Sequence, residues 1–242
     1  MKVFLAAEIG SNWEGSIPKA KKIINECKKS GANAVKFQMW RAEDLYPGHS
    51  LFKIIKKSEL SFKQAKTIKK FSESIGIEFF CSVFYPEAVD FLEELGVKHY
   101  KIASRTCVLK DPFSIETIKA VNKTRKPTFV SMGMGGNRKT IEKLLHKNKT
   151  DFCYCISEYP LNIKKINWKE STKFSGFSDH TLGITAPIVY ASLMNQKKTK
   201  SIFIEKHVKL TQSKSLDAST SIDTKELEIM NHTLREIEKI KI

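Results

Sequence analysis

The sequence has no apolar run approaching the roughly 20 residues that a membrane-spanning helix requires. Its N-terminal stretch, MKVFLAAEIGSNWEG, is apolar only for a short distance because Glu8 interrupts it, and no cleavage-site pattern follows. We therefore interpret this stretch as a first strand rather than a signal peptide. The expectation is a cytoplasmic protein without a membrane partner.

Paired cysteines are also missing. The five cysteines form an odd number and no CxxC pair occurs, which argues against a disulfide framework and against a structural zinc site. Cys153 and Cys155 alternate along an expected strand. We expect both to be reduced and at least one to be buried.

The arginine clusters and interleaved aromatic residues of a nucleic-acid-binding module are absent, although the formal net charge is +16. The lysines are scattered through short groups such as KAKK, KIIKK and KKTK. We therefore expect no nucleic-acid partner. The charge is compatible with long-range attraction of an anionic substrate, but it does not establish one.

The chain does contain a regular alternation of short apolar runs and amphipathic helical stretches. Strands are expected at 3–9, 33–40, 77–84, 97–104, 126–134, 150–157, 174–180 and 201–208. Helices are expected at 17–31, 58–76, 86–96, 111–124, 137–149, 184–196 and 223–240. The segment between the sixth and seventh strands is irregular, with at most a short helix. Eight such units predict an α/β protein, a (β/α)8 TIM barrel forming a single domain over residues 1–242.

Two of the expected strands finish on histidines, His180 and His207. A lone histidine at a strand end is usually a surface or capping residue. In a barrel of this type, however, catalytic groups gather at the C-terminal ends of the strands. Because the seventh and eighth strands are neighbours, the two imidazoles can converge at the barrel mouth. Two imidazoles with a nearby carboxylate suit a divalent transition metal with open coordination positions.

Polar side chains mark the ends of the other strands. Lys36 and Gln38 alternate onto one face of the second strand. Lysines in apolar strands are costly to bury without an anionic partner, so Lys36 and Lys101 need an explanation. A salt bridge with a barrel glutamate such as Glu8 is the structural one. Serine hydroxyls around them favour instead a phosphate and carboxylate cradle. The rim also includes Ser11, Asn12, Ser82, Ser104, Ser131, Ser157, Tyr159, Ser178 and Asp179.

The motifs AEIGSNWEG, AVKFQ, HYKIAS, VSMGM, SEYP, GFSDHTLG and IEKH occur in this order. Through them the chain resembles the sialic acid synthase family over essentially its whole length. The resemblance implies condensation of phosphoenolpyruvate with an N-acylated hexosamine aldehyde, which gives a nonulosonic acid and phosphate. In such a reaction a Lewis acid polarises the open-chain aldehyde, water adds at C2 of phosphoenolpyruvate, and C3 attacks the aldehyde.

The resemblance also assigns roles to residues. His180 and His207 would bind a divalent metal, Mn2+ first, with Mg2+ or Co2+ as alternatives. Glu8, Gln38 and Asp217 would contact the sugar, and with Lys36 and Lys101 they are the candidate catalytic residues. Phosphoenolpyruvate would be held by Lys36, Lys101, Ser82, Ser104, Ser131, Ser157, Tyr159 and Ser178.

Several positions depart from the family pattern. The usual NHxG turn reads Asn12-Trp13-Glu14-Gly15, without its histidine, and Arg105 and Thr106 replace a glycine and an acidic residue. The loop with Asp217 lacks its neighbouring histidine. The chain resembles a barrel-only member without the C-terminal antifreeze-like domain. Three alternatives stay open for the sugar site without that domain. A separately encoded domain completes the site, Arg105 takes the place of the arginine that the domain supplies and binds substrate, or the acceptor differs. A homodimer is expected from the resemblance alone.

Two alternatives stay open beside the nonulosonic acid synthase. One is a related phosphoenolpyruvate–aldose condensation that makes another 3-deoxy-ulosonic acid. The other is a non-catalytic barrel that binds a phosphosugar or a partner. The presence of both rim histidines and both rim lysines argues against the second alternative.

Overall fold

The protein, described by a computed structural model over residues 1–241, forms a closed barrel of eight parallel strands that pair in chain order. β1 and β8 close the barrel through pairs that run from Lys2 with Ser201 to Glu8 with His207. The predicted (β/α)8 barrel is confirmed, and residue 242 of the predicted domain lies outside the described residues. The strands are β1 (Lys2–Glu8), β2 (Ala34–Met39), β3 (Glu78–Val83), β4 (Tyr100–Ile102), β5 (Thr128–Ser131), β6 (Thr150–Cys155), β7 (Gly176–Asp179) and β8 (Ser201–His207).

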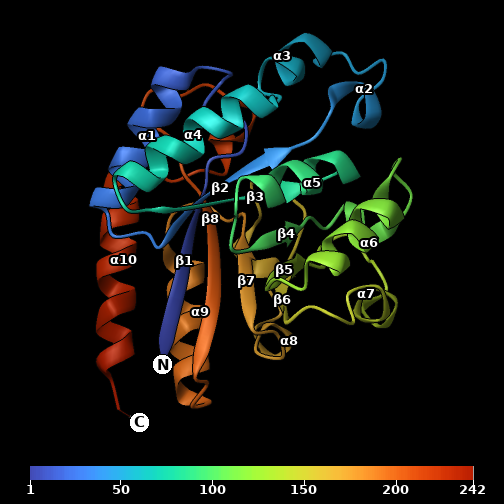
Figure 1. Cartoon of the computed structure of the whole chain (residues 1–242). Coiled ribbons are helices and arrows are strands. Elements are labelled where there is room, and N and C mark those ends of the chain that lie inside the picture. The colour runs from blue at the N-terminus through green and yellow to red at the C-terminus, as the bar shows by residue number, and fades with distance from the viewer. Residues whose placement is uncertain (242) are drawn as a thin grey trace.

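Helices surround the barrel (Figure 1). They are α1 (Ile17–Lys29), α4 (Phe62–Ser74), α5 (Pro86–Glu94), α6 (Ser114–Thr124), α7 (Arg138–Leu144), α8 (Trp168–Ser171), α9 (Thr185–Gln196) and α10 (Thr224–Lys239). Two short helices that the sequence did not predict, α2 (Ala42–Leu45) and α3 (Phe52–Lys57), lie in the long connection after β2. In Figure 1 they project at the end of the molecule opposite to the two chain termini.

Local chemistry explains where the helices begin. Ser61 caps α4 by accepting a hydrogen bond from the Gln64 backbone N–H, and the Gln64 side chain returns to the Ser61 backbone. This capping box satisfies backbone donors that the first turn would leave unpaired, so α4 begins at Phe62 rather than at residue 58. Asp223 caps α10 in the same way with Glu226.

The barrel interior changes character along its axis. The half nearest the N-terminal ends of the strands is filled by a phenylalanine cluster: Phe4, Phe80, Phe129 and Phe203. The rings of Phe129 and Phe203 stack with their centroids 3.8 Å apart. Side chains two residues apart on a strand share a face, so Glu205 and then His207 follow Phe203 along the interior face of β8. The aromatic plug therefore leaves the C-terminal half of the interior to polar groups.

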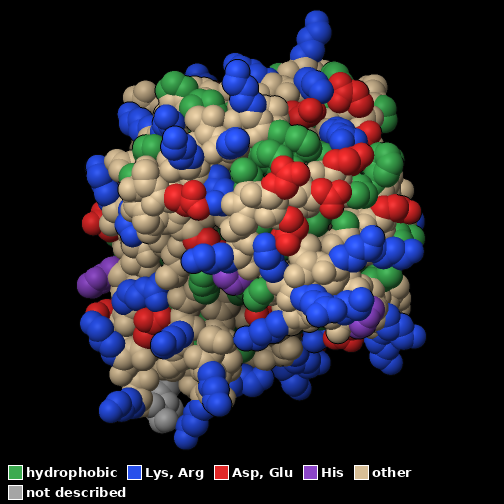
Figure 2. All heavy atoms as spheres, viewed as in Figure 1, with side chains coloured by type: hydrophobic (Ala, Val, Ile, Leu, Met, Phe, Trp, Pro, Cys, Tyr) green, Lys and Arg blue, Asp and Glu red, His purple; other side chains and the backbone are tan. Residues whose placement is uncertain are grey.

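The five cysteines are free and buried, which includes both Cys153 and Cys155, of which at least one was predicted to be buried. Among the helices of residues 1–241, none combines the length and the apolar character that crossing a bilayer demands. Lysine and arginine side chains are spread over the face seen in Figure 2 rather than gathered in one stripe.

Candidate active site

A pocket of about 670 Å³ opens at the C-terminal ends of the strands. Every catalytic, substrate-binding or metal-binding residue predicted from the sequence lines it except Glu8, which is buried and pairs with the pocket-lining Lys36. The rim prediction was wrong for Asp179, which pairs with Lys206 outside the pocket, and Ser11 and Asn12 do not line the pocket either. The pocket residues expected from the sequence are Lys36, Gln38, Ser82, Lys101, Ser104, Arg105, Ser131, Ser157, Tyr159, Ser178, His180, His207 and Asp217.

Lys36 is held at the base of the pocket by an ion pair with Glu8. Its ammonium also donates to the Ser82 hydroxyl at 2.8 Å, and Gln38 Nε2 donates to Glu8 Oε1 at 2.8 Å. Both charged side chains are almost completely buried. Burial raises the pKa of Glu8 to about 6, although the Lys36 ammonium opposes the shift. A carboxyl group with this pKa can hold or release a proton near neutral pH.

Glu205 is a site residue that sequence reasoning missed. Its carboxylate lies 3.2 Å from Lys101 Nζ and 3.7 Å from Lys36 Nζ, and Ser178 Oγ donates to it at 2.9 Å. Burial would raise the pKa of Glu205, but the ammonium groups of Lys101 and Lys36 lower it to about 2. The sequence did carry a signal, because Glu205 stands two residues before His207 and shares its face of β8.

Lys36 and Lys101 are therefore both ion-paired with glutamates, and both line the same pocket. The Oε2 atoms of Glu8 and Glu205 accept no hydrogen bond by geometry, but both contact lysine ammonium groups in the ion pairs. The hydroxyl of Ser131, buried at the pocket wall, has neither a hydrogen bond nor an ion pair. Buried polar groups in folded proteins are usually satisfied, so this hydroxyl beside two ammonium groups is suited to receive a polar ligand atom.

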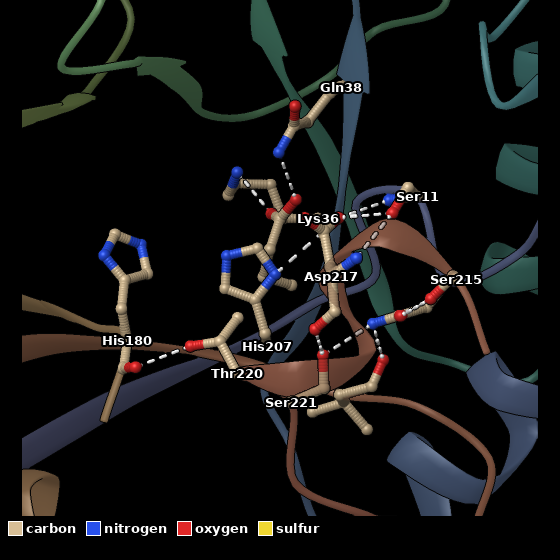
Figure 3. Close-up of polar contacts among 12 residues, drawn as sticks. Ser11, Lys36, Gln38, His180, His207, Ser215, Asp217, Thr220 and Ser221 are labelled. Carbon is tan, nitrogen blue, oxygen red and sulfur yellow. Dashed lines mark hydrogen bonds and ion pairs between the residues drawn. The ribbon is translucent and has the colours of Figure 1, made fainter. Parts of the chain in front are cut away.

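His180 and His207 converge as predicted, with ring centroids 5.5 Å apart (Figure 3). His180 Nδ1 lies 2.8 Å from the Ile156 carbonyl oxygen and 4.0 Å from Cys155 Sγ. Burial opposes charge on His180, but Cys155 and the carbonyl raise its pKa overall. His207 differs, because burial lowers its pKa to about 3 and keeps it neutral. Its Nδ1 is buried without a hydrogen-bond partner.

Asp217 reaches the site from the loop that follows β8. Ser11 fixes its carboxylate through the backbone N–H at 2.7 Å and the hydroxyl at 2.8 Å. The carboxylate lies 4.0 Å from His207 Nδ1 (Figure 3). Gly10 permits this approach, since it has φ of +48° and a Cβ there would lie 2.4 Å from Asp217 Oδ2. The turn after β1 thus positions an acid beside the histidines.

The substituted turn position has a structural explanation. Trp13 points away from the pocket, is buried, and packs edge-on against Phe37 with centroids 6.3 Å apart. Asn12 keeps a positioning role, since its amide donates to the Val208 carbonyl at 2.8 Å and to Ser221 Oγ at 2.9 Å. The missing histidine is therefore replaced by core packing.

The remaining rim residues come from β4, β5 and β6. Ser104 Oγ accepts from the Gly133 backbone at 2.9 Å. A Cβ at Gly133 would lie 2.8 Å from both Ser157 Oγ and Cys155 Sγ, so only glycine fits beside these side chains. The ring of Tyr159 is half exposed and packs over His180 with centroids 4.1 Å apart. Tyr159, which follows β6, therefore lies beside both histidines.

Arg105 lines the pocket, but its charge is already compensated within the chain. Nε and Nη2 bind the two carboxylate oxygens of Asp111 at 2.5 Å and 2.8 Å. Nη2 also donates to the Leu45 carbonyl oxygen at 3.1 Å. No pattern in the sequence pairs these two residues, which lie on either side of a short 3-10 helix (Thr106–Val108).

The surroundings of His180 and His207 bear on whether the two histidines can hold a metal ion. Within residues 1–241, no set of three or more His, Cys, Asp or Glu side chains surrounds a common point as a metal cage would. The neutral His207 with its unpartnered nitrogen, and His180 oriented by a backbone carbonyl, nevertheless have the features of imidazole ligands. The residues fit an ion bound by two imidazoles, with its other positions left to water or substrate, as catalytic metals require.

Comparison with known proteins agrees with this arrangement. A model of the "NeuB family" matches residues 23–241. The N,N'-diacetyllegionaminic acid synthase of Legionella pneumophila is 27% identical, over 99% of this chain and 73% of that protein. The N-acetylneuraminate-9-phosphate synthase of Homo sapiens is 26% identical, over 98% of this chain and 70% of its own length.

A solved structure is also similar. It is the N-acetylneuraminic acid (sialic acid) synthetase from Leptospira borgpetersenii serovar Hardjo-bovis in complex with citrate. It superposes with a TM-score of 0.87 at 26% identity, over 99% of this chain and 85% of that one.

Proposed function

This chain belongs to the NeuB family of sialic and related acid synthases, and we propose that it condenses phosphoenolpyruvate with an N-acylated hexosamine in its open-chain aldehyde form. C3 of phosphoenolpyruvate forms the new bond to the aldehyde carbon, and water adds to C2. The C2–O bond to phosphate then breaks. The products are one nonulosonic acid and one phosphate, so the atoms balance without a redox partner.

The observation that carries this proposal is the pair of buried lysines beneath the two histidines. Lys36 and Lys101 present two ammonium groups to a pocket whose walls carry serine hydroxyls. Phosphate and carboxylate are the anions such a group of donors binds best. Both lysines are paired with glutamates, so carboxylates of the protein balance their charge before the substrate binds. An ammonium group has three N–H donors, and Lys101 contacts only Glu205 within residues 1–241, so donors remain for the phosphate that leaves.

The other side chains have roles at the reacting centre. Glu8, with a pKa raised by burial to about 6, is the candidate proton donor or acceptor at this end of the pocket. Gln38, hydrogen-bonded to Glu8, and Asp217, held by Ser11, orient the acceptor hydroxyls. Glu205 keeps Lys101 in place.

His180 and His207 would hold the divalent ion, for which we propose Mn2+, with Mg2+ and Co2+ as substitutes. When bound, such an ion supplies a Lewis acid for the acceptor carbonyl. The support for this assignment is the neutral state of His207 and its unpartnered nitrogen.

The test is phosphate release from phosphoenolpyruvate with Mn2+ against N-acylated hexosamines and simple aldoses, with and without a chelator. We expect release that needs an N-acylated hexosamine and stops with chelator, and a product mass equal to the sum of both substrates plus water minus phosphoric acid. Preference for a simple aldose would favour the 3-deoxy-ulosonate alternative. No release with any sugar, despite measurable Mn2+ binding, would favour a non-catalytic barrel.

A further inference from the structure

The outer end of the pocket differs in chemistry from its base. Its wall, here called the outer wall, consists of Trp40, Tyr46, Phe84, Ala103, Val108, Met134 and Leu216. Trp40 and Phe84 are largely buried, and Tyr46 packs edge-on against Trp40 with centroids 6.0 Å apart. The outer wall is therefore apolar and preformed by packing.

Arg105 is the cation fixed against this wall. Its guanidinium lies 4.9 Å from the Tyr46 ring centre, and the fork formed by Nε and Nη2 is occupied by Asp111. The Leu45 carbonyl oxygen takes a second hydrogen bond from Nη2. An arginine binds phosphate strongly through two parallel N–H donors, and here those donors are taken by a carboxylate.

The orientation of the acceptor follows from the proposed function, on which this inference rests. Its aldehyde carbon must reach phosphoenolpyruvate at the base, between Lys36 and Lys101. The far end of a six-carbon acceptor then points to the outer wall, beside Arg105 and Asp111. A phosphate at that end would meet an occupied guanidinium and the Asp111 carboxylate.

We propose that Asp111 is a specificity-determining residue, and that by neutralising Arg105 it restricts the acceptor to an N-acylated hexosamine without phosphate. The acyl and other apolar groups of such an acceptor pack against the outer wall. Lys110 also lines the pocket, is exposed, and forms no ion pair within residues 1–241. Its ammonium is a hydrated point charge without the bidentate fork of an arginine. Lys110 is the same in the wild-type protein and in Asp111→Asn, so the comparison of these two isolates Asp111.

The test compares kcat/KM for one N-acylated hexosamine and for its 6-phosphate. The wild-type protein should prefer the neutral sugar by roughly tenfold or more, as expected when a charge-assisted bidentate contact is withheld from phosphate. Asp111→Asn keeps the shape but frees the guanidinium, so it should reduce that preference by about tenfold. Lys98→Gln, the matched control at an exposed lysine outside the pocket lining, should leave the ratio within about twofold.

A second variant keeps the inference testable if Asp111→Asn fails to fold. Arg105→Gln leaves the Asp111 carboxylate at the outer wall without its partner, so it should keep or increase the preference for the neutral sugar. The inference is overturned if the wild-type protein prefers the 6-phosphate, if Asp111→Asn leaves the ratio unchanged, or if Arg105→Gln improves use of the 6-phosphate.

Binding measured by calorimetry separates this inference from the proposed function. Hexosamine 6-phosphate should bind Asp111→Asn about tenfold more tightly than it binds the wild-type protein, whether or not either turns over. If no sugar supports phosphate release but this gain appears, the proposed function fails and the role of Asp111 stands. If both sugars are used and the gain is absent, the role of Asp111 fails and the proposed function stands.

Discussion

Adjacent residues of β8 carry buried charges that face opposite sides of the barrel wall. Glu205 points inward, where it lies near Lys101 and Lys36 and lines the pocket. Lys206 points outward and is fully enclosed with Asp179, its Nζ 2.6 Å from Asp179 Oδ2. Lys206 also donates to the Thr181 carbonyl oxygen, while Asp179 accepts from the Thr181 backbone N–H at 2.9 Å and its hydroxyl at 3.0 Å.

The difference separates two uses of a buried ion pair. The outward pair is saturated with hydrogen bonds from the turn that carries His180, so it holds that turn and offers nothing to a ligand. The inward pairs face a pocket, where the Ser131 hydroxyl is unpartnered and the Lys101 ammonium contacts only Glu205 within residues 1–241. Incomplete satisfaction is costly in a core, and it is the property that a binding site needs.

The largest effect should come from the inward side. His207→Ala should reduce metal-dependent turnover by about a thousandfold or more, since a Lewis acid supplies several kcal/mol at the reacting carbonyl. The fold should survive, because His207 Nδ1 has no hydrogen bond to lose. Mn2+ affinity and turnover are the measurements, with the exposed His232→Ala as the control. Turnover within tenfold of wild type would remove the metal assignment.

The outward pair should instead control stability. Lys206→Met leaves Asp179 buried without its cation, which should lower the free energy of unfolding by about 3–5 kcal/mol. The double variant Lys206→Met/Asp179→Asn should recover a large part of this loss, because asparagine keeps an acceptor for Thr181. Urea unfolding followed by circular dichroism measures both. A loss below about 1 kcal/mol for the single variant would mean that this pair behaves like an exposed one.

Lys101→Ala tests whether an inward pair serves a ligand. Losing a charged hydrogen-bond donor of about 1.5–3 kcal/mol should weaken phosphoenolpyruvate binding about 10- to 100-fold. Glu205 still has Lys36 at 3.7 Å, so the fold should tolerate the change. Titration calorimetry with the exposed Lys98→Ala as control gives the comparison. Unchanged affinity would leave Lys101 as a partner of Glu205 and nothing more.

The smallest expected effect concerns pH. Burial raises the pKa of Glu8 from about 4.5 to about 6, so the folded protein binds a proton there that the unfolded chain has released. The contribution of Glu8 to stability therefore falls as the pH rises through this window, by about 2 kcal/mol in total. Glu8→Gln does not titrate. Its unfolding free energy should gain about 2 kcal/mol on that of the wild type between about pH 3.5 and about pH 7, of which about 1.3 kcal/mol falls between about pH 4.5 and about pH 6. Parallel curves for the two proteins would contradict the shift.

Much of the architecture was predictable because it depends on local patterns. Alternating apolar runs and amphipathic stretches gave all eight strands and the main helices, with errors mostly at the ends of elements. The helices α2 and α3 were missed because they are short and have no long amphipathic period. Placing strand ends at one rim was enough to gather the pocket residues, and Glu205 was overlooked although it shares a face with His207.

The sequence by itself determined the fold and the order of the strands around the barrel. It also determined the face on which each strand residue lies, because successive side chains of a strand point to opposite faces. It did not determine partners. Glu8 was named beforehand as a possible partner of a rim lysine, but only the closed barrel decided that it pairs with Lys36. The closed barrel also decided that Lys101 pairs with Glu205 and that Arg105 is occupied by Asp111. It also decided that Trp13 fills core space rather than the pocket. These choices depend on distances of a few ångströms between side chains from different strands and loops, and Coulomb and hydrogen-bond energies change steeply over such distances.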